Sequence, residues 1–374
     1  MDYPAQRRER LARLLPEEGL SAFLITNAVN VTYLTGFSGD SSVLILGRDR
    51  AVLVSDPRYT QQITEECGDL PTHIRPPAQK LNDAVAEALT KLGHRNVGFE
   101  SGGLFVSDLE AFRAAAPSIN WKGATERVER LRMVKDDWEI GQIREAIDIA
   151  ERAFTAFRAM LRRDDVEREL GHRMEGLVRH CGGQSTCFPT IVGVGERAAL
   201  PHAPPTKRRV ASSELVLVDW GVNGPLSYKS DLTRVLTARN ISSKLKVVYA
   251  VVLQAQQQAI RAVRPGVKAE AIDAEARAVI AEAGFGEFFG HGLGHGLGLQ
   301  VHEGPAVRPH SETVLEPGMV FTIEPGIYLP DWGGIRIEDD VLVTPDGCEV
   351  LTTAPRKLED MTAFDAEIIG KPRS

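Results

Sequence analysis

The amino-acid sequence predicts two domains, a small α/β domain over residues 1–125 and a larger α+β domain over residues 126–374. The chain has 374 residues, which is long for one domain and typical of two. In its first third, short apolar runs alternate with helical patterns. The remainder combines long amphipathic helices with strand-like runs, which is typical of an antiparallel sheet with helices packed on one face.

The first domain is predicted from apolar runs that turn residues bound on both sides. Strands are expected over residues 21–26, 42–46, 51–55 and 96–99. Helices are expected between or after them, over residues 56–66, 81–92 and 107–115. The strongly charged segment 126–135 is expected to bridge the two domains.

The second domain is predicted to open with a long helix, for which Asp136 and Asp137 supply the N-cap. One face of this helix is apolar, because Trp138, Ile140, Ile143, Ile147, Ala150, Phe154 and Phe157 repeat at steps of three and four. Further helices are expected over residues 165–181, 243–263 and 268–283. Strands are expected over residues 190–194, 214–220, 231–237, 319–325 and 335–343.

Charge and cysteine content argue against several classes of protein. The chain has 44 Lys and Arg against 51 Asp and Glu, a net charge of −7, so we expect no nucleic-acid partner. Its four cysteines form no C-x-x-C pair and are expected to be reduced thiols. The N-terminus has no secretory h-region and no apolar run approaches a membrane span. We therefore expect a cytoplasmic protein without a membrane partner.

Two aspartates lie at the ends of a predicted hairpin in the second domain. Asp219 ends the apolar run 215–218, and Asp231 follows the turn-like segment 221–230. The hairpin would bring both carboxylates to the same end of the sheet. Taken singly, each aspartate is also compatible with a turn or cap residue, although a carboxylate at the end of a buried strand is costly without a partner.

Two glutamates have a similar setting. Glu324 ends the apolar run 319–323. Glu338 lies on the predicted strand 335–343, where alternation places it on the same face as Arg336. For Glu338 alone, an edge strand stabilised by a salt bridge explains the pattern equally well.

Histidine is concentrated in one glycine-rich segment. His291, His295 and His302 fall within twelve residues, and the segment 289–303 that contains them has five glycines. Glycine allows the backbone to approach a ligand closely. The alternative is a flexible loop with incidental histidines, but such a loop would not need Leu and Val at the intervening positions.

The carboxylates and the histidine together predict a metal site. Four converging carboxylates without a cation would repel each other and be forced to protonate. Oxygen-rich ligation with one imidazole suits Mn, Co, Zn or Fe. It also suits two ions that share bridging carboxylates, about 3.5–4 Å apart.

The blocks that carry these residues resemble the pita-bread metallopeptidases, in the prolidase and aminopeptidase P branch. In the first domain the resemblance rests on Tyr33–Phe37 and Asp56–Tyr59. In the second it rests on five ordered blocks, Asp219–Gly221, Ser230–Arg234, His291–Glu303, Glu324–Gly326 and Arg336–Asp339. The resemblance covers the whole chain. It implies a pita-bread (creatinase/aminopeptidase) catalytic domain over residues 126–374, after a creatinase/prolidase-like domain over residues 1–125.

The resemblance also implies a metal-binding set. By its pattern, Asp231 and Glu338 bridge two divalent ions, Asp219 completes one ion, and His295 and Glu324 complete the other. Glu324 doubles as the general base. Mn is the expected metal, with Co or Zn as alternatives.

Four further residues match positions with a role in catalysis. His202 matches the histidine that holds the substrate near the scissile bond, and His302 matches the one that stabilises the tetrahedral intermediate. His291 and Arg336 match positions behind the ligands or at the proline pocket. The implied activity is that of a homodimeric Xaa-Pro peptidase acting on peptides with proline in the second position.

Two departures from the family pattern affect this expectation. The turn between Asp219 and Asp231 is about one residue longer than usual. Dipeptidases of the group carry an Arg directly after the proline that follows the third histidine, whereas here Pro305 is followed by Ala306, and the next arginine is Arg308. This favours an Xaa-Pro aminopeptidase that accepts longer peptides over a strict Xaa-Pro dipeptidase (prolidase).

Two other functions are compatible with the same fold. A catalytically inactive pita-bread module that binds peptides would have lost metal ligands, and none is missing here. A metal-free C–N hydrolase such as creatinase would lack the carboxylate set altogether.

Overall fold

The computed structural model describes residues 2–68 and 70–366, and the chain divides into two compact units, Met1–Arg132 and Met133–Ser374. The charged segment that we expect to bridge the domains forms helix α6 (Arg127–Met133), at whose end the division falls. Each unit has its own hydrophobic core.

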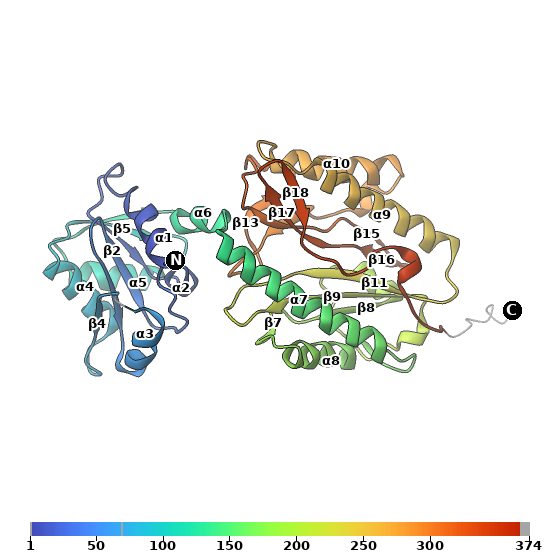
Figure 1. Ribbon diagram of the computed structural model, residues 1–374, viewed down its shortest axis with the longest axis horizontal. Coiled ribbons are helices and arrows are strands. Elements are labelled where there is room, and N and C mark those ends of the chain that lie inside the picture. The colour runs from blue at the N-terminus through green and yellow to red at the C-terminus, as the bar shows by residue number, and fades with distance from the viewer. Residues whose placement is uncertain (1, 69, 367–374) are drawn as a thin grey trace. The chain divides into compact units, whose positions relative to one another are not determined.

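The first unit is a six-stranded sheet with helices (Figure 1). Its strand order is β4-β3-β2-β1-β5-β6, antiparallel among β1 to β3 and parallel elsewhere. The strands are β1 (Ala22–Ile25), β2 (Val43–Gly47), β3 (Ala51–Ser55), β4 (Thr72–Ile74), β5 (Asn96–Glu100) and β6 (Asn120–Ala124). The helices are α1 (Tyr3–Ala12), α2 (Ala28–Thr35), α3 (Thr60–Glu66), α4 (Leu81–Lys91) and α5 (Val106–Ala115). The unit contains the four strands and three helices that the sequence predicts, and in addition β4, β6, α1 and α2, which the sequence analysis did not predict.

The second unit contains the long helix expected at its start, α7 (Asp137–Met160). Asp136 caps it in a reciprocal capping box, since its carboxylate accepts the Glu139 N–H at 3.0 Å and the Glu139 carboxylate accepts the Asp136 N–H at 3.1 Å. The other helices are α8 (Glu167–His180), α9 (Ser243–Ala262) and α10 (Ala269–Glu282), and all three match predicted segments.

Two larger sheets form the centre of this unit. The first has the order β19-β11-β9-β8 and the second the order β13-β12-β14-β17-β18; β10 pairs with β7, and β15 with β16. The strands are β7 (Ser185–Thr186), β8 (Ile191–Val194), β9 (Leu215–Trp220), β10 (Val222–Asn223), β11 (Leu232–Ala238), β12 (Gly294–Gly296), β13 (Glu303–Val307), β14 (Val320–Ile323), β15 (Gly326–Leu329), β16 (Gly333–Arg336), β17 (Asp339–Thr344), β18 (Gly347–Val350) and β19 (Thr362–Phe364).

Two details of the second unit differ from the prediction. The unit has two larger sheets rather than one, with α8 beside the first and α9 and α10 beside the second (Figure 1). The segment 335–343 is not one strand: β16 pairs with β15 and β17 pairs with β14. A chain that changes partner must leave one ladder before it joins the next, so Ile337 and Glu338 lie between the two strands. Apolar and charged side chains alternate without a break through residues 335–338, so the sequence pattern does not reveal that one strand ends and another begins here.

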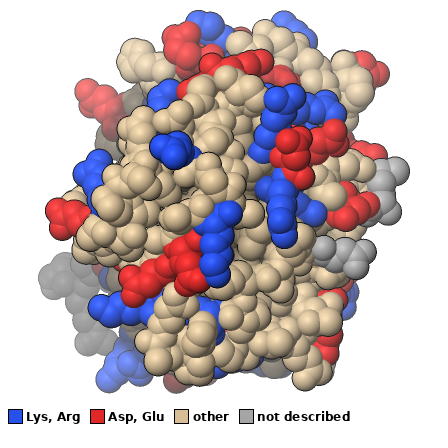
Figure 2. All heavy atoms as spheres, turned by 90° about the vertical axis from the view of Figure 1, so that its left-hand side faces the viewer, with Lys and Arg blue, Asp and Glu red and all other residues tan. Residues whose placement is uncertain are grey.

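The surface carries charges of both signs. Figure 2 shows Lys and Arg side chains interspersed with Asp and Glu over one face of the molecule. The four cysteines are free and partly buried. Within the described residues, no helix combines the length and apolar character that a membrane crossing requires.

Candidate functional site

Strand ends bring together the acidic residues singled out in the sequence. Asp219 lies on β9 opposite Thr233 of β11, and Asp231 directly precedes β11, so the predicted hairpin is confirmed. Glu324 directly follows β14, and Glu338 lies at the joint between β16 and β17.

His295 reaches the same place from the glycine-rich segment. It lies on β12, which pairs with both β13 and β14. Close packing explains the flanking glycines: a Cβ on Gly294 would lie 2.0 Å from the Thr322 carbonyl oxygen, and one on Gly296 would lie 1.9 Å from that of Gly304. Side chains at these positions would push the strands apart and displace the imidazole.

The predicted ligand atoms are close enough to share a cation. The Nε2 atom of His295 lies 3.4 Å from Oε1 of Glu324 and 3.7 Å from Oδ2 of Asp231. One ligand atom each of Asp231, His295 and Glu338 lies within 4.8 Å of the others. Asp219 joins the group through Arg336, whose Nη2 donates to Oδ2 of Asp219 at 2.5 Å and whose Nε lies 4.0 Å from Oε2 of Glu324.

Burial makes these carboxylates unfavourable without a cation. Asp219, Asp231 and Glu338 are 8%, 4% and 2% exposed. Burial raises the pKa of all three, and neighbouring acidic groups raise those of Asp231 and Glu338 further. Burial also raises the pKa of Glu324 to about 8.

The donor set fits a divalent metal ion. The Oδ1 atoms of Asp219 and Asp231 are buried and have no hydrogen-bond partner. Buried polar atoms are rarely left unpaired, and oxygen atoms around an imidazole are suitable ligands. Burial lowers the pKa of His295 to about 4, so its ring is neutral near pH 7 and Nε2 can act as a metal ligand.

Hydrogen bonds support the acidic cluster from behind. Arg336 Nε donates to Thr233 Oγ1 at 3.0 Å, and that hydroxyl donates to Oε2 of Glu338 at 2.6 Å. Arg336 Nη1 donates to the Tyr328 hydroxyl at 2.8 Å, which lies 2.9 Å from Nε2 of His291. Arg336 and His291 therefore lie within one network with the acidic cluster.

The two remaining predicted histidines are exposed beside the cluster. The rings of His302 and His295 meet edge to face with centroids 4.2 Å apart. Burial of part of its ring lowers the pKa of His302, and the nearby His202 lowers it further. His202 is also close enough to Asp219 to lower the pKa of that carboxyl, against the larger rise caused by burial. Both histidines are exposed and thus accessible to a substrate.

Sequence analysis missed two residues of this network. Thr233 lies in a block that was singled out, but its link to Glu338 depends on the contact between β11 and the β16–β17 joint. Tyr328 had no signal in the sequence, since an aromatic residue on a strand is ordinary; burial raises its pKa to about 12.

The metal-free protein is expected to lose stability as the pH rises. The Glu324 pKa lies near 8 in the folded chain against 4.5 in the unfolded one, so between these values the folded state holds an extra proton. The resulting stabilisation is complete below about pH 4.5 and is lost as the pH rises through about 8, by about 1.4 kcal/mol per proton and pH unit. Thermal unfolding after treatment with a chelator should give a lower Tm at pH 8 than at pH 5. Mn²⁺ should reduce this difference, and a Tm that is flat or rises without metal would contradict it.

Comparison with known proteins gives two family matches. Residues 141–345 match metallopeptidase family M24, and residues 7–134 match the Creatinase/Prolidase N-terminal domain.

Three relatives of known name match over almost their whole length. The chain is 35% identical to the Xaa-Pro dipeptidase of Pyrococcus horikoshii, over 96% of this chain and 100% of that protein. The solved structure of an Xaa-Pro dipeptidase from Bacillus anthracis has a TM-score of 0.91 at 36% identity, covering 95% of this chain and 99% of that one. An X-Pro aminopeptidase from Thermotoga maritima has a TM-score of 0.87 at 35% identity, covering 96% and 100%.

Proposed function

The chain belongs to metallopeptidase family M24, and from this membership we propose that it is an Xaa-Pro aminopeptidase that uses two divalent ions. It would hydrolyse the bond between an N-terminal residue and a following proline. The proposed ligands are Asp219, Asp231, His295, Glu324 and Glu338. The observation that carries the proposal is the pair of buried, unpartnered carboxylate oxygens of Asp219 and Asp231, which lie among further acids and a neutral imidazole. Mn is the proposed native metal, and a cytoplasmic homodimer is part of the same proposal.

The proposed mechanism assigns proton transfer to Glu324. The chemistry that the ions supply when bound is a lowered pKa of water and polarisation of the substrate carbonyl. The Glu324 carboxylate accepts the proton of the attacking water and returns it to the proline nitrogen as that nitrogen leaves. The hydrogen bond from Thr322 Oγ1 to Oε1 of Glu324, at 3.3 Å, orients this carboxylate.

Histidines are proposed to act on the substrate. His302, neutral near pH 7 because its pKa is lowered, donates a hydrogen bond to the oxygen of the tetrahedral intermediate. His202 holds the peptide beside the scissile bond. Since an Xaa-Pro amide has no N–H, proline is selected by the shape of a slot rather than by a hydrogen bond, and we place this slot beside His291 and Arg336.

The preference for peptides longer than two residues is supported by the register of β12 and β13. Ala306 lies directly opposite His295, so a small apolar side chain occupies this place beside the proposed ligand. Arg308 follows two positions later and is exposed. It lies close to Gly292, since a Cβ atom added to that glycine would be 2.8 Å from the Cβ of Arg308. We propose that Arg308 binds the terminal carboxylate of a peptide that extends beyond proline.

Replacing Arg308 with Ala is expected to raise KM for an Xaa-Pro-Yaa tripeptide about tenfold, because a charge-assisted hydrogen bond to the carboxylate is lost. KM for the tripeptide amide, which has no such carboxylate, should not change. The matched control is Arg264→Ala, which removes an exposed arginine of the same unit.

Comparison of kcat/KM for Xaa-Pro and Xaa-Pro-Yaa tests the substrate class directly. The proposal predicts faster hydrolysis of the tripeptide. Hydrolysis of the dipeptide alone would instead identify a strict Xaa-Pro dipeptidase, the function in the names of several relatives.

A further inference from the structure

Two of the proposed ligands lie where regular strand pairing stops. Asp231 precedes β11, and Glu338 lies between β16 and β17. The Asp231 N–H donates to a side chain, Oδ2 of Asp340, at 3.2 Å. The Glu338 N–H donates to the Thr233 carbonyl at a long 3.3 Å. Something other than a regular ladder must therefore fix the distance between these two carboxylates.

We propose that Arg234 is the positioning residue that sets this distance. Its side chain is completely buried, and all five N–H groups have acceptors. Nη1 donates to the carbonyls of Thr233 at 2.9 Å and Glu338 at 2.5 Å. One guanidinium group therefore links two backbone carbonyls by hydrogen bonds. The first belongs to Thr233, near the start of β11 and close to Asp231, and the second belongs to Glu338.

The other donors of Arg234 anchor it to the surrounding structure. Nη2 donates to Oδ1 of Asp339 at 2.7 Å and to the Ala354 carbonyl at 2.8 Å, and Nε donates to the Pro355 carbonyl at 2.9 Å. A planar group held at all five donors cannot rotate or shift without breaking several hydrogen bonds.

Asp339, which follows Glu338, also has several hydrogen-bond partners, and both oxygens of its carboxylate accept hydrogen bonds. Its Oδ1 also accepts the Thr352 hydroxyl at 2.7 Å, and its Oδ2 accepts Gln256 Nε2 at 2.9 Å and a guanidinium N–H of Arg356. Several buried hydrogen bonds to one carboxylate, some of them from charged donors, hold that carboxylate in one position. Glu338 is therefore constrained through its own carbonyl and through the side chain of the next residue.

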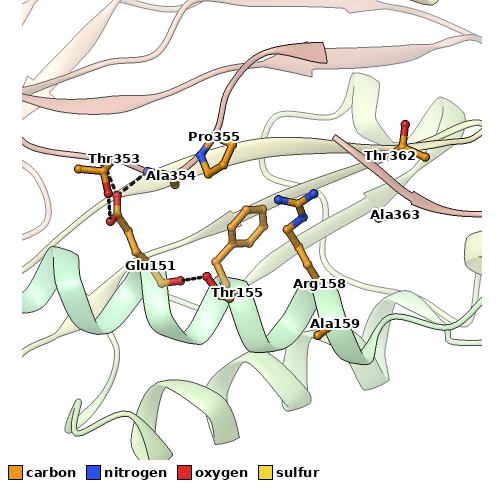
Figure 3. Close-up of a pocket in the computed structure, with 10 residues that line it drawn as sticks. Glu151, Thr155, Arg158, Ala159, Thr353, Ala354, Pro355, Thr362 and Ala363 are labelled. Atoms are coloured by element: carbon orange, nitrogen blue, oxygen red, sulfur yellow. Dashed lines mark hydrogen bonds between the residues drawn. The ribbon is translucent and has the colours of Figure 1, made fainter. Parts of the chain in front are cut away.

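The part of the network farthest from the proposed ligands is hydrogen-bonded to helix α7. Figure 3 shows the Glu151 carboxylate beneath Thr353 and Ala354, at the edge of a cavity of about 580 Å³ that none of the proposed ligands lines. Glu151 accepts the Ala354 N–H at 2.7 Å and the Thr353 hydroxyl at 2.5 Å. The segment 353–355, whose carbonyls accept hydrogen bonds from Arg234, is therefore hydrogen-bonded to the long, capped helix α7. This contact restricts the movement of the Arg234 acceptors.

The test is the Arg234→Lys variant of the full-length protein, compared with Arg173→Lys. A lysine keeps the charge but offers three donors and no planar fork, so it cannot reach all five acceptors. Arg173 is a matched control, because it binds Asp165 through two N–H groups at 2.7 and 2.8 Å and the Met160 carbonyl at 3.2 Å, and contacts no proposed ligand.

Mn²⁺ binding is measured by calorimetry, and the bound ions by electron paramagnetic resonance, at a temperature at which both variants are folded. Arg234→Lys is expected to weaken binding of at least one Mn²⁺ about 10- to 100-fold and to reduce the signal of a spin-coupled Mn pair. Arg173→Lys is expected to keep both properties even if its Tm falls. Unchanged Mn²⁺ affinity and spin coupling in Arg234→Lys would overturn the inference.

A milder variant covers the case in which Arg234→Lys does not fold. Thr352→Val removes one hydrogen bond to Asp339 with little change of shape, and should weaken Mn²⁺ binding several-fold; no change would count against the network. The inference rests on the proposed ligand set. If the unmodified protein binds no Mn²⁺, the proposed function itself fails, whereas normal binding in both the protein and its variants refutes only the positioning role.

Discussion

Replacing Glu324 with Gln is expected to lower kcat for Xaa-Pro substrates by about 10²- to 10⁴-fold, the contribution typical of a general base. The amide keeps the shape of the side chain but cannot accept the proton of the attacking water. Burial raises the pKa of Glu324 to about 8 in the metal-free chain, and a nearby cation would lower it toward neutrality, where a general base is most effective. Steady-state kinetics with Mn²⁺ in excess measure the effect.

The matched control for this variant is Glu349→Gln, which neutralises an exposed glutamate paired with Arg144 at 2.6 Å. Its kcat should stay within about twofold of the unmodified protein, because exposed ion pairs contribute little. Activity of Glu324→Gln within tenfold of the unmodified protein would assign proton transfer to another group.

Replacing Asp231 with Asn is expected to have two opposite effects. It should abolish tight binding of Mn²⁺, because a proposed bridging carboxylate is lost, and activity should fall below detection. It should also stabilise the metal-free protein, because burial raises the pKa of Asp231 and the neighbouring Glu338, Asp219, Asp340 and Glu324 raise it further. Removing one charge relieves this repulsion, and a gain of about 1 kcal/mol corresponds to about 2–4 °C in Tm.

Metal analysis and thermal unfolding, with and without chelator, measure both effects on the same preparation. Asp148→Asn is the control, since Asp148 is exposed and pairs with Arg152 of the same helix, α7, at 3.0 Å. If Asp231→Asn bound as much Mn²⁺ as the unmodified protein, Asp231 would not be a ligand. A lower Tm without metal would show that its charge is stabilised by other means.

The residues of the acidic cluster were accessible to sequence reasoning because each has a local signal. Asp219 and Glu324 end apolar strands, Asp231 follows a turn, and His295 lies among glycines. Such signals depend on neighbours along the chain. A hairpin also has a predictable partner, so the proximity of Asp219 and Asp231 could be inferred without a structure.

The parts that could not be predicted depend on contacts between distant segments. Glu338 was predicted as a ligand, but its place at a joint where the chain changes sheets was not, because the alternation of side chains does not reveal a change of partner. Every residue of β11 is buried, so the pattern does not separate Arg234 from its neighbours. The acceptors of Arg234 come from three segments up to 121 residues away, and only the folded chain brings them together.

The most direct test of the account is anomalous diffraction from crystals of the protein grown with Mn²⁺. We predict two anomalous peaks about 3.5–4 Å apart, in contact with Asp219, Asp231, His295, Glu324 and Glu338. Peaks elsewhere, or none at this cluster while the protein hydrolyses Xaa-Pro peptides, would contradict the proposal that these five side chains hold the catalytic metal.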